Sequence, residues 1–131
     1  MIDIYGKVVM SKRTILVVED YDDSREFMKF LLEDFGYIVT EATDGLEAIA
    51  EITRRLPDLV LMDMRMPRMD GLTATRIIRK SESKTRLPIL AVTANGKDYY
   101  EKAIEAGCNA MIQKPVDFVT LHPIIKQYLD H

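Results

Sequence analysis

Several polar residues stand in the sequence at points where a short apolar run ends. They comprise three carboxylates, one hydroxyl and one ammonium group: Glu19, Asp20, Asp63, Thr93 and Lys114. Short unbroken apolar runs are typical of strands that are covered on both faces of a parallel sheet. Ligands of such sheets bind outside the carboxyl ends of the strands. If the runs form neighbouring parallel strands, all five side chains face one cleft.

The chemistry of that cleft follows from its charges. Three clustered carboxylates raise one another's pKa, so a positive group belongs among them. Oxygen ligands of this kind suit Mg²⁺, which is usually held by one or two carboxylates together with phosphate oxygens. A lysine and a hydroxyl opposite the ion would neutralise and hydrogen-bond the oxygens of a phosphoryl group. Asp63 could then attack phosphorus and form an aspartyl phosphate.

Each of these residues also has a purely structural explanation. Glu19-Asp20 could cap the following helix, Thr93 could cap a later one, and Lys114 could be a solvated lysine. For Asp63 the structural explanation is weak, because Asp70 is better placed to cap the helix that continues through Leu72. A functional role is therefore favoured for Asp63.

The elements that must position these residues alternate along the chain. Strands are predicted at residues 14–18, 37–42, 59–63, 89–92 and 110–112, each followed by a helix. This alternation predicts a doubly wound α/β fold, with a five-stranded parallel sheet, right-handed crossovers and helices on both faces. The strand at 37–42 alternates in polarity and is expected near a sheet edge.

Helical spacing predicts which side chains point inward. In the first helix the residues at this spacing are Phe27, Phe30, Leu31, Asp34 and Phe35, and in the second Leu46, Ile49, Ile52 and Leu56 share one face. Pro123 interrupts the last helix, which we expect to be regular only from about Leu121.

Composition excludes several classes of protein. The 131 residues suit one domain, and 47% hydrophobic and 30% charged residues are typical of a globular protein. A net charge of −3 gives no general attraction to nucleic acid or to anionic membranes. A single cysteine excludes an internal disulfide, and no signal peptide is evident, so the cytoplasm is the expected compartment. We expect residues 1–12 to be a loosely ordered N-terminal extension and residues 13–131 to form the domain.

The set of motifs resembles the receiver domain of two-component response regulators, of the single-domain chemotaxis type. The matching residues, in order, are Glu19-Asp20, Asp63, Met66-Pro67, Met69-Asp70-Gly71, Thr93-Ala94 and Lys114-Pro115. Each motif is weak alone, but their order and separations match the family from about Thr14 to Leu129.

The resemblance implies a flavodoxin-like fold with strand order 2-1-3-4-5 and a role for each site residue. Asp63 would be the phosphoacceptor, and Mg²⁺ would be bound by Asp63, by Asp20 directly, by Glu19 partly through water, and by the Arg65 carbonyl. Lys114 would bind the phosphoryl group, and the Lys114–Pro115 peptide would be cis. Thr93 would move toward the phosphoryl oxygens. Met111 occupies the position of the family's switching aromatic residue, and a thioether has no ring to rotate.

The leading hypothesis is a phosphorylation-activated switch. A sensor histidine kinase or phosphotransfer protein would phosphorylate Asp63, and the face formed by the fourth helix, fifth strand and fifth helix would change its binding to an effector protein. No direct binding to nucleic acid or membrane is expected, and phosphorylation-dependent dimerisation is left open. The chain would catalyse only its own phosphorylation and dephosphorylation.

Two alternatives belong to other classes. A receiver-like interaction module that no longer uses phosphate is supported only by Met111. A metal-dependent phosphatase would need a second carboxylate just after Asp63, where Arg65 stands, and a connection long enough to form a lid.

Overall fold

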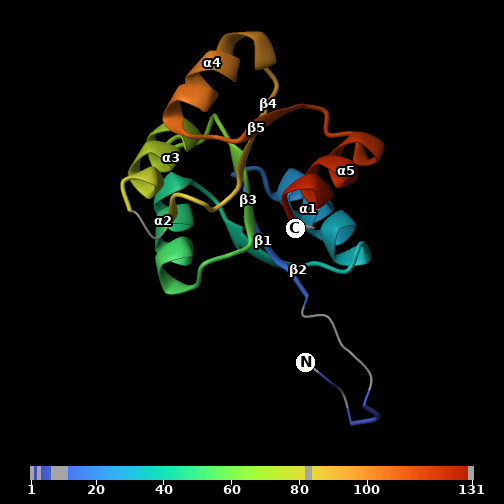
Figure 1. Ribbon diagram of the computed structural model, residues 1–131. Helices are drawn as coiled ribbons and strands as arrows, with labels where there is room; N and C mark the ends of the chain where they lie inside the picture. The colour runs from blue at the N-terminus through green and yellow to red at the C-terminus, as the bar shows by residue number, and fades with distance from the viewer. Residues whose placement is uncertain (1, 3, 7–11, 82–83, 130–131) are drawn as a thin grey trace.

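The computed structural model describes residues 2, 4–6, 12–81 and 84–129. Its strands form a parallel sheet that lies between two layers of helices (Figure 1). The strands are β1 (Thr14–Val18), β2 (Ile38–Ala42), β3 (Leu59–Asp63), β4 (Ile89–Thr93) and β5 (Ala110–Gln113). The helices are α1 (Asp22–Asp34), α2 (Gly45–Arg54), α3 (Gly71–Arg79), α4 (Gly96–Ala106) and α5 (Phe118–Leu129). The strand order is β2-β1-β3-β4-β5, so the predicted fold class and topology are confirmed.

The strand register brings the ends of the strands to one edge of the sheet. Val18 lies opposite Met62, so that Glu19 follows beside Asp63. Asp63 lies opposite Val92, and Thr93 lies opposite Gln113. The chain leaves β1 toward β2 on one side and returns to β3 on the other. The site edge therefore contains the topological switch point at which ligands of such sheets bind.

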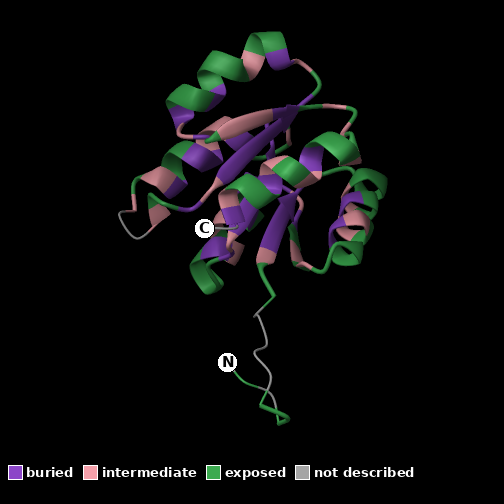
Figure 2. Ribbon diagram, turned by 45° about the vertical axis from the view of Figure 1, so that its right-hand side comes forward, coloured by how far each residue is buried: buried purple, intermediate pink, exposed green. Residues whose placement is uncertain are grey.

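Two apolar cores fill the space on either side of the sheet. On one face, Leu16, Val60 and Met62 pack with residues of α2, α3 and α4. On the other face, Val17, Leu61 and neighbouring strand residues pack with residues of α1 and α5. Strand residues alternate between the two cores because successive side chains point to opposite faces. Figure 2 shows buried strands between helices whose outer surfaces are exposed.

The inward face of α1 differs from the prediction. Phe27 and Phe30 are 60% and 68% exposed, whereas Met28 and Leu32 are buried against the sheet. Met28 and Leu32 are four residues apart and so share one face of the helix. The predicted face was set by the aromatic residues, and it is rotated relative to the face that packs.

The ends of α2 and α5 also differ from the predictions. Leu46 and Leu56 are about half exposed, and Leu56 lies beyond the end of α2, whose core contacts are made by Ala48 and Ile52. In α5 the helix is continuous from Phe118 despite Pro123. Asp117 explains the early start, because its side chain accepts a hydrogen bond from the Val119 backbone N–H (3.0 Å) and secures the first turn.

The N-terminal residues that the structure describes are exposed. Ile2, Ile4 and Tyr5 are each at least 65% exposed. The remaining positions of the predicted extension, 1, 3 and 7–11, lie outside the described residues, so the boundary after residue 12 stays a prediction. Within the described ranges, no helix combines the length and apolar character needed to cross a membrane.

The packing of α1 can be tested with two substitutions in the same helix. Leu32→Ala removes a side chain with no exposed surface, and we expect it to lower the free energy of unfolding by about 2–5 kcal/mol. Phe30→Ala removes a larger but mostly exposed side chain, and the expected change is within about 0.5 kcal/mol. Urea denaturation measures both, and a greater loss for Phe30→Ala would contradict the observed orientation.

Candidate functional site

The residues predicted from the sequence line one cleft at the carboxyl edge of the sheet. The cleft has a volume of about 290 Å³, and its lining includes Glu19, Asp20, Asp63, Arg65, Thr93 and Lys114. They come from the ends of β1, β3, β4 and β5, which the parallel register places side by side. The structure therefore brings together every predicted site residue, while the role of each remains a prediction.

Asp63 lies at the centre of the cleft and is only 6% exposed. Its Oδ1 accepts a hydrogen bond from the Arg65 backbone N–H (3.1 Å), and its Oδ2 accepts one from Lys114 Nζ (3.2 Å). Lys114 Nζ also donates to Glu19 Oε1 (2.9 Å). One ammonium group thus bridges carboxylates that lie at the ends of β1 and β3. The Lys114–Pro115 peptide is cis, as the sequence resemblance implied.

Negative charge outweighs positive charge at this point. Oxygen atoms of Glu19, Asp20 and Asp63 all lie within 4.8 Å of one another, and Lys114 is the cation that contacts two of them. Burial, together with a hydrogen bond to the Asp63 carboxyl group, raises the pKa of Glu19 to about 7. Burial alone would lower the pKa of Lys114, but its contacts with Glu19 and Asp63 outweigh that effect and raise it.

The donor set suits a hard divalent cation. Three carboxylates converge, two of them buried, and a single ammonium group does not balance their charge. Oxygen-only ligands at such a cleft are typical of Mg²⁺ sites that keep part of their water shell. Asp20 is exposed and can turn toward an ion without losing an internal partner of its own among the described contacts. Arg65 lines the same cleft, and its carbonyl as a ligand stays a prediction.

Thr93 connects the cleft to the loop that precedes α4. The residue is 1% exposed, and its Oγ1 accepts a hydrogen bond from the Asn95 backbone N–H (3.1 Å). Its carbonyl accepts from the Lys114 backbone N–H (2.8 Å), which fixes the end of β4 against the end of β5. The hydroxyl proton is not used by the bond from Asn95, so Thr93 can donate to a group bound in the cleft.

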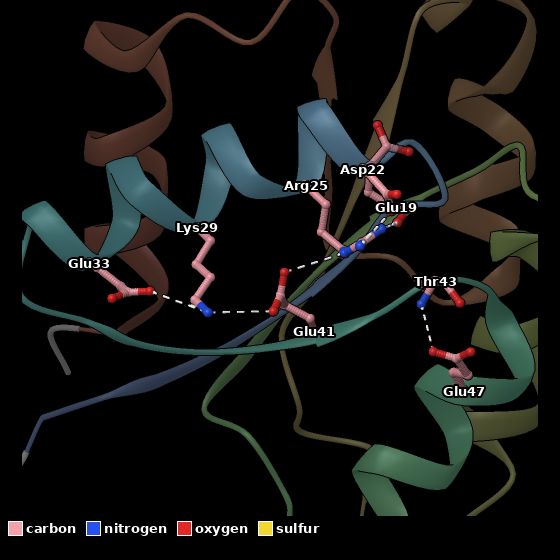
Figure 3. Close-up of polar contacts among 8 residues, drawn as sticks. All are labelled: Glu19, Asp22, Arg25, Lys29, Glu33, Glu41, Thr43 and Glu47. Carbon is pink, nitrogen blue, oxygen red and sulfur yellow. Dashed lines mark hydrogen bonds and ion pairs between the residues drawn. The ribbon is translucent and has the colours of Figure 1, made fainter.

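An ion network holds the acidic loop between β1 and α1 (Figure 3). The Arg25 guanidinium donates to the Glu19 carbonyl (2.9 Å), to Asp22 (2.7 Å) and to Glu41 on β2 (3.3 Å). Lys29 also pairs with Glu41, at 3.5 Å. Arg25 therefore fixes the backbone of Glu19 to both the following helix and the edge strand.

The loop between β3 and α3 is held at its far end. Arg68 adopts a left-handed backbone conformation (φ 62°), and its guanidinium forms an ion pair with the buried carboxylate of Asp44. The Gly45 backbone N–H donates to the Met69 carbonyl (2.9 Å). A hydrogen bond from the Glu47 backbone N–H, with the Arg68 ion pair, lowers the pKa of Asp44. The loop after Asp63 is thus anchored to the N-terminus of α2.

A second, mostly apolar cavity of about 250 Å³ adjoins the site beneath α1. Phe27, Met28 and Leu31 line one side, and Pro115 and Val116 line another, while Glu19, Asp63 and Lys114 border it. The partly exposed Phe27 therefore lines a cavity that also borders the site, rather than lying inside the core.

Three supporting residues were not predicted from the sequence: Arg25, Arg68 and Gln113. Arg25 and Arg68 lie within six residues of a predicted site residue, and Gln113 directly precedes Lys114. Their contacts are to backbone groups or to residues of another element, which local patterns do not encode. The sequence signal that could have indicated these three residues is their nearness to a predicted site residue. Many exposed polar residues are equally near, so this signal does not single them out.

Comparison with protein families identifies the class of protein. The family model of the response regulator receiver domain matches residues 15–126. The chain therefore belongs to the response regulator receiver domain family, a signalling family of two-component systems. The family resemblance inferred from the sequence motifs is confirmed.

Individual relatives agree with this assignment. An uncharacterized 14.6 kDa protein of Leptolyngbya boryana is 37% identical over 91% of this chain and 92% of its own length. The polar-differentiation response regulator DivK of Brucella ovis is 33% identical over 89% of this chain and 96% of its own length. The receiver domain of a sensor histidine kinase from Pseudomonas aeruginosa PAO1, solved with a magnesium ion coordinated in the active site cleft, superposes with a TM-score of 0.86. It is 35% identical and covers 92% of this chain and 100% of that one.

The raised pKa of Glu19 makes the stability of the metal-free protein depend on pH. A carboxyl group with a higher pKa in the folded protein binds more protons when folded, so its contribution to stability is lost as pH rises from 4.5 through about 7. We expect the free energy of unfolding of the wild type to fall relative to Glu19→Gln between about pH 5 and about pH 8. Urea denaturation with EDTA present measures the difference, and a difference that is independent of pH would contradict this expectation.

Proposed function

We propose that this chain is a phosphorylation-activated signalling switch whose phosphoacceptor is Asp63. The observation that carries the proposal is the contact of Lys114 Nζ with both Asp63 and Glu19 in a cleft that also contains Asp20 and Thr93. A nucleophilic carboxylate, a cation, a hydroxyl and a divalent-ion donor set are the groups that phosphoryl transfer to an aspartate requires.

Each residue has a defined part in the reaction. An Asp63 carboxylate oxygen attacks the phosphorus of a phosphohistidine; the new P–O bond forms as the P–N bond breaks, and the imidazole leaves with the electron pair and is protonated. Lys114 and the Thr93 hydroxyl bind oxygens of the transferred group. Glu19, Asp20, Asp63 and the Arg65 carbonyl would hold Mg²⁺, which when bound neutralises charge on the phosphoryl oxygens.

The proposed output surface is the face formed by α4, β5 and α5. On α4, Tyr100 is 53% exposed and Ile104 is 41% exposed, and on α5 Val119 is 82% exposed. Apolar groups of this size at the surface are available to a protein partner. The α4 helix begins three residues after Thr93, so a change at Thr93 has a short covalent path to this face.

The proposed partners follow from the chemistry. A sensor histidine kinase or a phosphotransfer protein would supply the phosphoryl group, and an effector protein would bind the output face. We place the protein in the cytoplasm and assign it no substrate turnover beyond its own phosphorylation and dephosphorylation. Dimerisation on phosphorylation is compatible with the proposal but is not part of it.

Covalent modification tests the proposal directly. Acetyl phosphate with Mg²⁺ should add one labile phosphoryl group to the wild type, and beryllium fluoride should bind as its stand-in. Asp63→Asn should abolish both, because the nucleophile is removed while the shape of the side chain is kept. Intact-protein mass spectrometry and ¹⁹F NMR measure the two outcomes.

The same experiment separates the alternatives. An unmodified wild type that also fails to bind beryllium fluoride would overturn the switch and leave the phosphorylation-independent interaction module. Continuous hydrolysis of an added phosphoester would instead indicate a phosphatase.

A pair of neighbouring aspartates tests the metal site. Asp20→Asn removes a proposed direct ligand, and we expect the Mg²⁺ affinity to fall at least about tenfold. Asp22→Asn is the matched control, because Asp22 is exposed and pairs with Arg25 rather than with the acidic cluster. Isothermal titration calorimetry measures both, and an Asp20→Asn variant that binds Mg²⁺ as tightly as the wild type would exclude Asp20 as a ligand.

A further inference from the structure

The loop between β4 and α4 is fastened to β5 by one side chain. The Gln113 carboxamide donates from Nε2 to the Ala94 carbonyl (2.7 Å), and its Oε1 accepts from the Gly96 backbone N–H (3.1 Å). Both polar ends of the amide are therefore used on the same three-residue loop. An amide that both donates and accepts fits this pair of backbone groups, whereas a carboxylate could satisfy only the Gly96 N–H.

The fit around Gly96 is close. A Cβ atom at position 96 would overlap Gln113 Oε1 and would lie 2.8 Å from Met111 Cε. Glycine is thus needed here for space. It is not needed for its backbone conformation, since φ at this position lies outside the left-handed region. The loop is packed directly against two β5 side chains, Met111 and Gln113.

The residue between Ala94 and Gly96 forms a hydrogen bond with the Thr93 side chain. Asn95 lies between Ala94 and Gly96, and its backbone N–H donates to Thr93 Oγ1 (3.1 Å). Thr93 is also the sheet partner of Gln113. A chain of contacts therefore runs from the Gln113 amide, through the backbone of Asn95, to the hydroxyl group in the cleft. The bond from Asn95 leaves the hydroxyl proton of Thr93 free to donate to a group bound at Asp63.

We propose that Gln113 is a positioning residue for phosphoryl binding: it fixes the loop from Ala94 to Gly96 so that the Asn95 N–H orients the Thr93 hydroxyl toward the cleft. The proposal rests on the proposed function of the site. Gln113 itself does not contact Asp63 among the described interactions, so it acts through Thr93. Through its bond to Gly96, Gln113 also connects the site to the first residue of α4. Met111, on the same strand as Gln113, has no aromatic ring that could make such a connection.

The test separates metal binding from binding of a phosphoryl analogue. Gln113→Leu keeps the size of the side chain and removes both amide contacts. We expect the affinity for beryllium fluoride, measured by ¹⁹F NMR at saturating Mg²⁺, to fall about tenfold. The Mg²⁺ affinity should stay unchanged, because the proposed metal ligands lie on other loops. Gln127→Leu, at an exposed position on α5, is the matched control and should change neither.

A double-mutant cycle shows whether Gln113 acts through Thr93. In a Thr93→Ala background, Gln113→Leu should cause no further loss of beryllium fluoride affinity, since interacting residues are non-additive. Gly96→Ala should reproduce the loss by displacing the Gln113 amide, and it should add little in a Gln113→Ala background.

The outcomes are distinguishable from those of the proposed function. A wild type that does not bind beryllium fluoride overturns the function itself. A wild type that binds it, with Gln113→Leu equally competent or with additive losses in the cycle, overturns the role of Gln113 alone. A parallel loss of Mg²⁺ affinity in Gln113→Leu would also overturn it, because general destabilisation would then explain the result.

Discussion

The close approach of like charges around Asp63 is the constraint on which the rest of the structure depends. Three carboxylates meet at the ends of β1 and β3, and Lys114 compensates for only part of their charge. Such an arrangement is costly in isolation, and it persists because the surrounding fold fixes its members. Arg25 holds the loop between β1 and α1, Arg68 holds the loop between β3 and α3, and Gln113 holds the loop between β4 and α4. Each of these side chains binds backbone or a neighbouring element, so each loop is tied to a second part of the fold.

The fold was predictable from the sequence because its signals are redundant. Apolar strand runs and glycines agree, and Asp70 caps α3 through the Thr73 backbone N–H (2.7 Å) as expected, although α1 and α4 begin without a side-chain cap. The site was predictable for a related reason. Parallel strands share one edge, so residues at strand ends meet whatever their separation in sequence, as Glu19 and Lys114 do.

The contacts that support the site were not predictable in this way. Helix orientation depends on which residues complement the sheet, and in α1 two aliphatic residues pack while two phenylalanines stay exposed. Phe35 stacks on both Phe118 and His122, a contact between α1's end and α5 that no local pattern indicates. The same holds for Asp44 and Arg68, whose pairing depends on the path of a loop. Long-range polar contacts of this kind are decided by tertiary geometry rather than by periodicity.

The charged network on β2 has a consequence for the outside of the molecule. β2 is an edge strand, and Glu41 on it is held by Arg25 and Lys29 of α1 (Figure 3). A foreign strand that paired with this edge would have to take those ions out of water, which is one of the ways in which natural sheets resist extension. The network that fixes the acidic loop therefore also places charged side chains along the edge strand, a feature that disfavours the addition of a sixth strand.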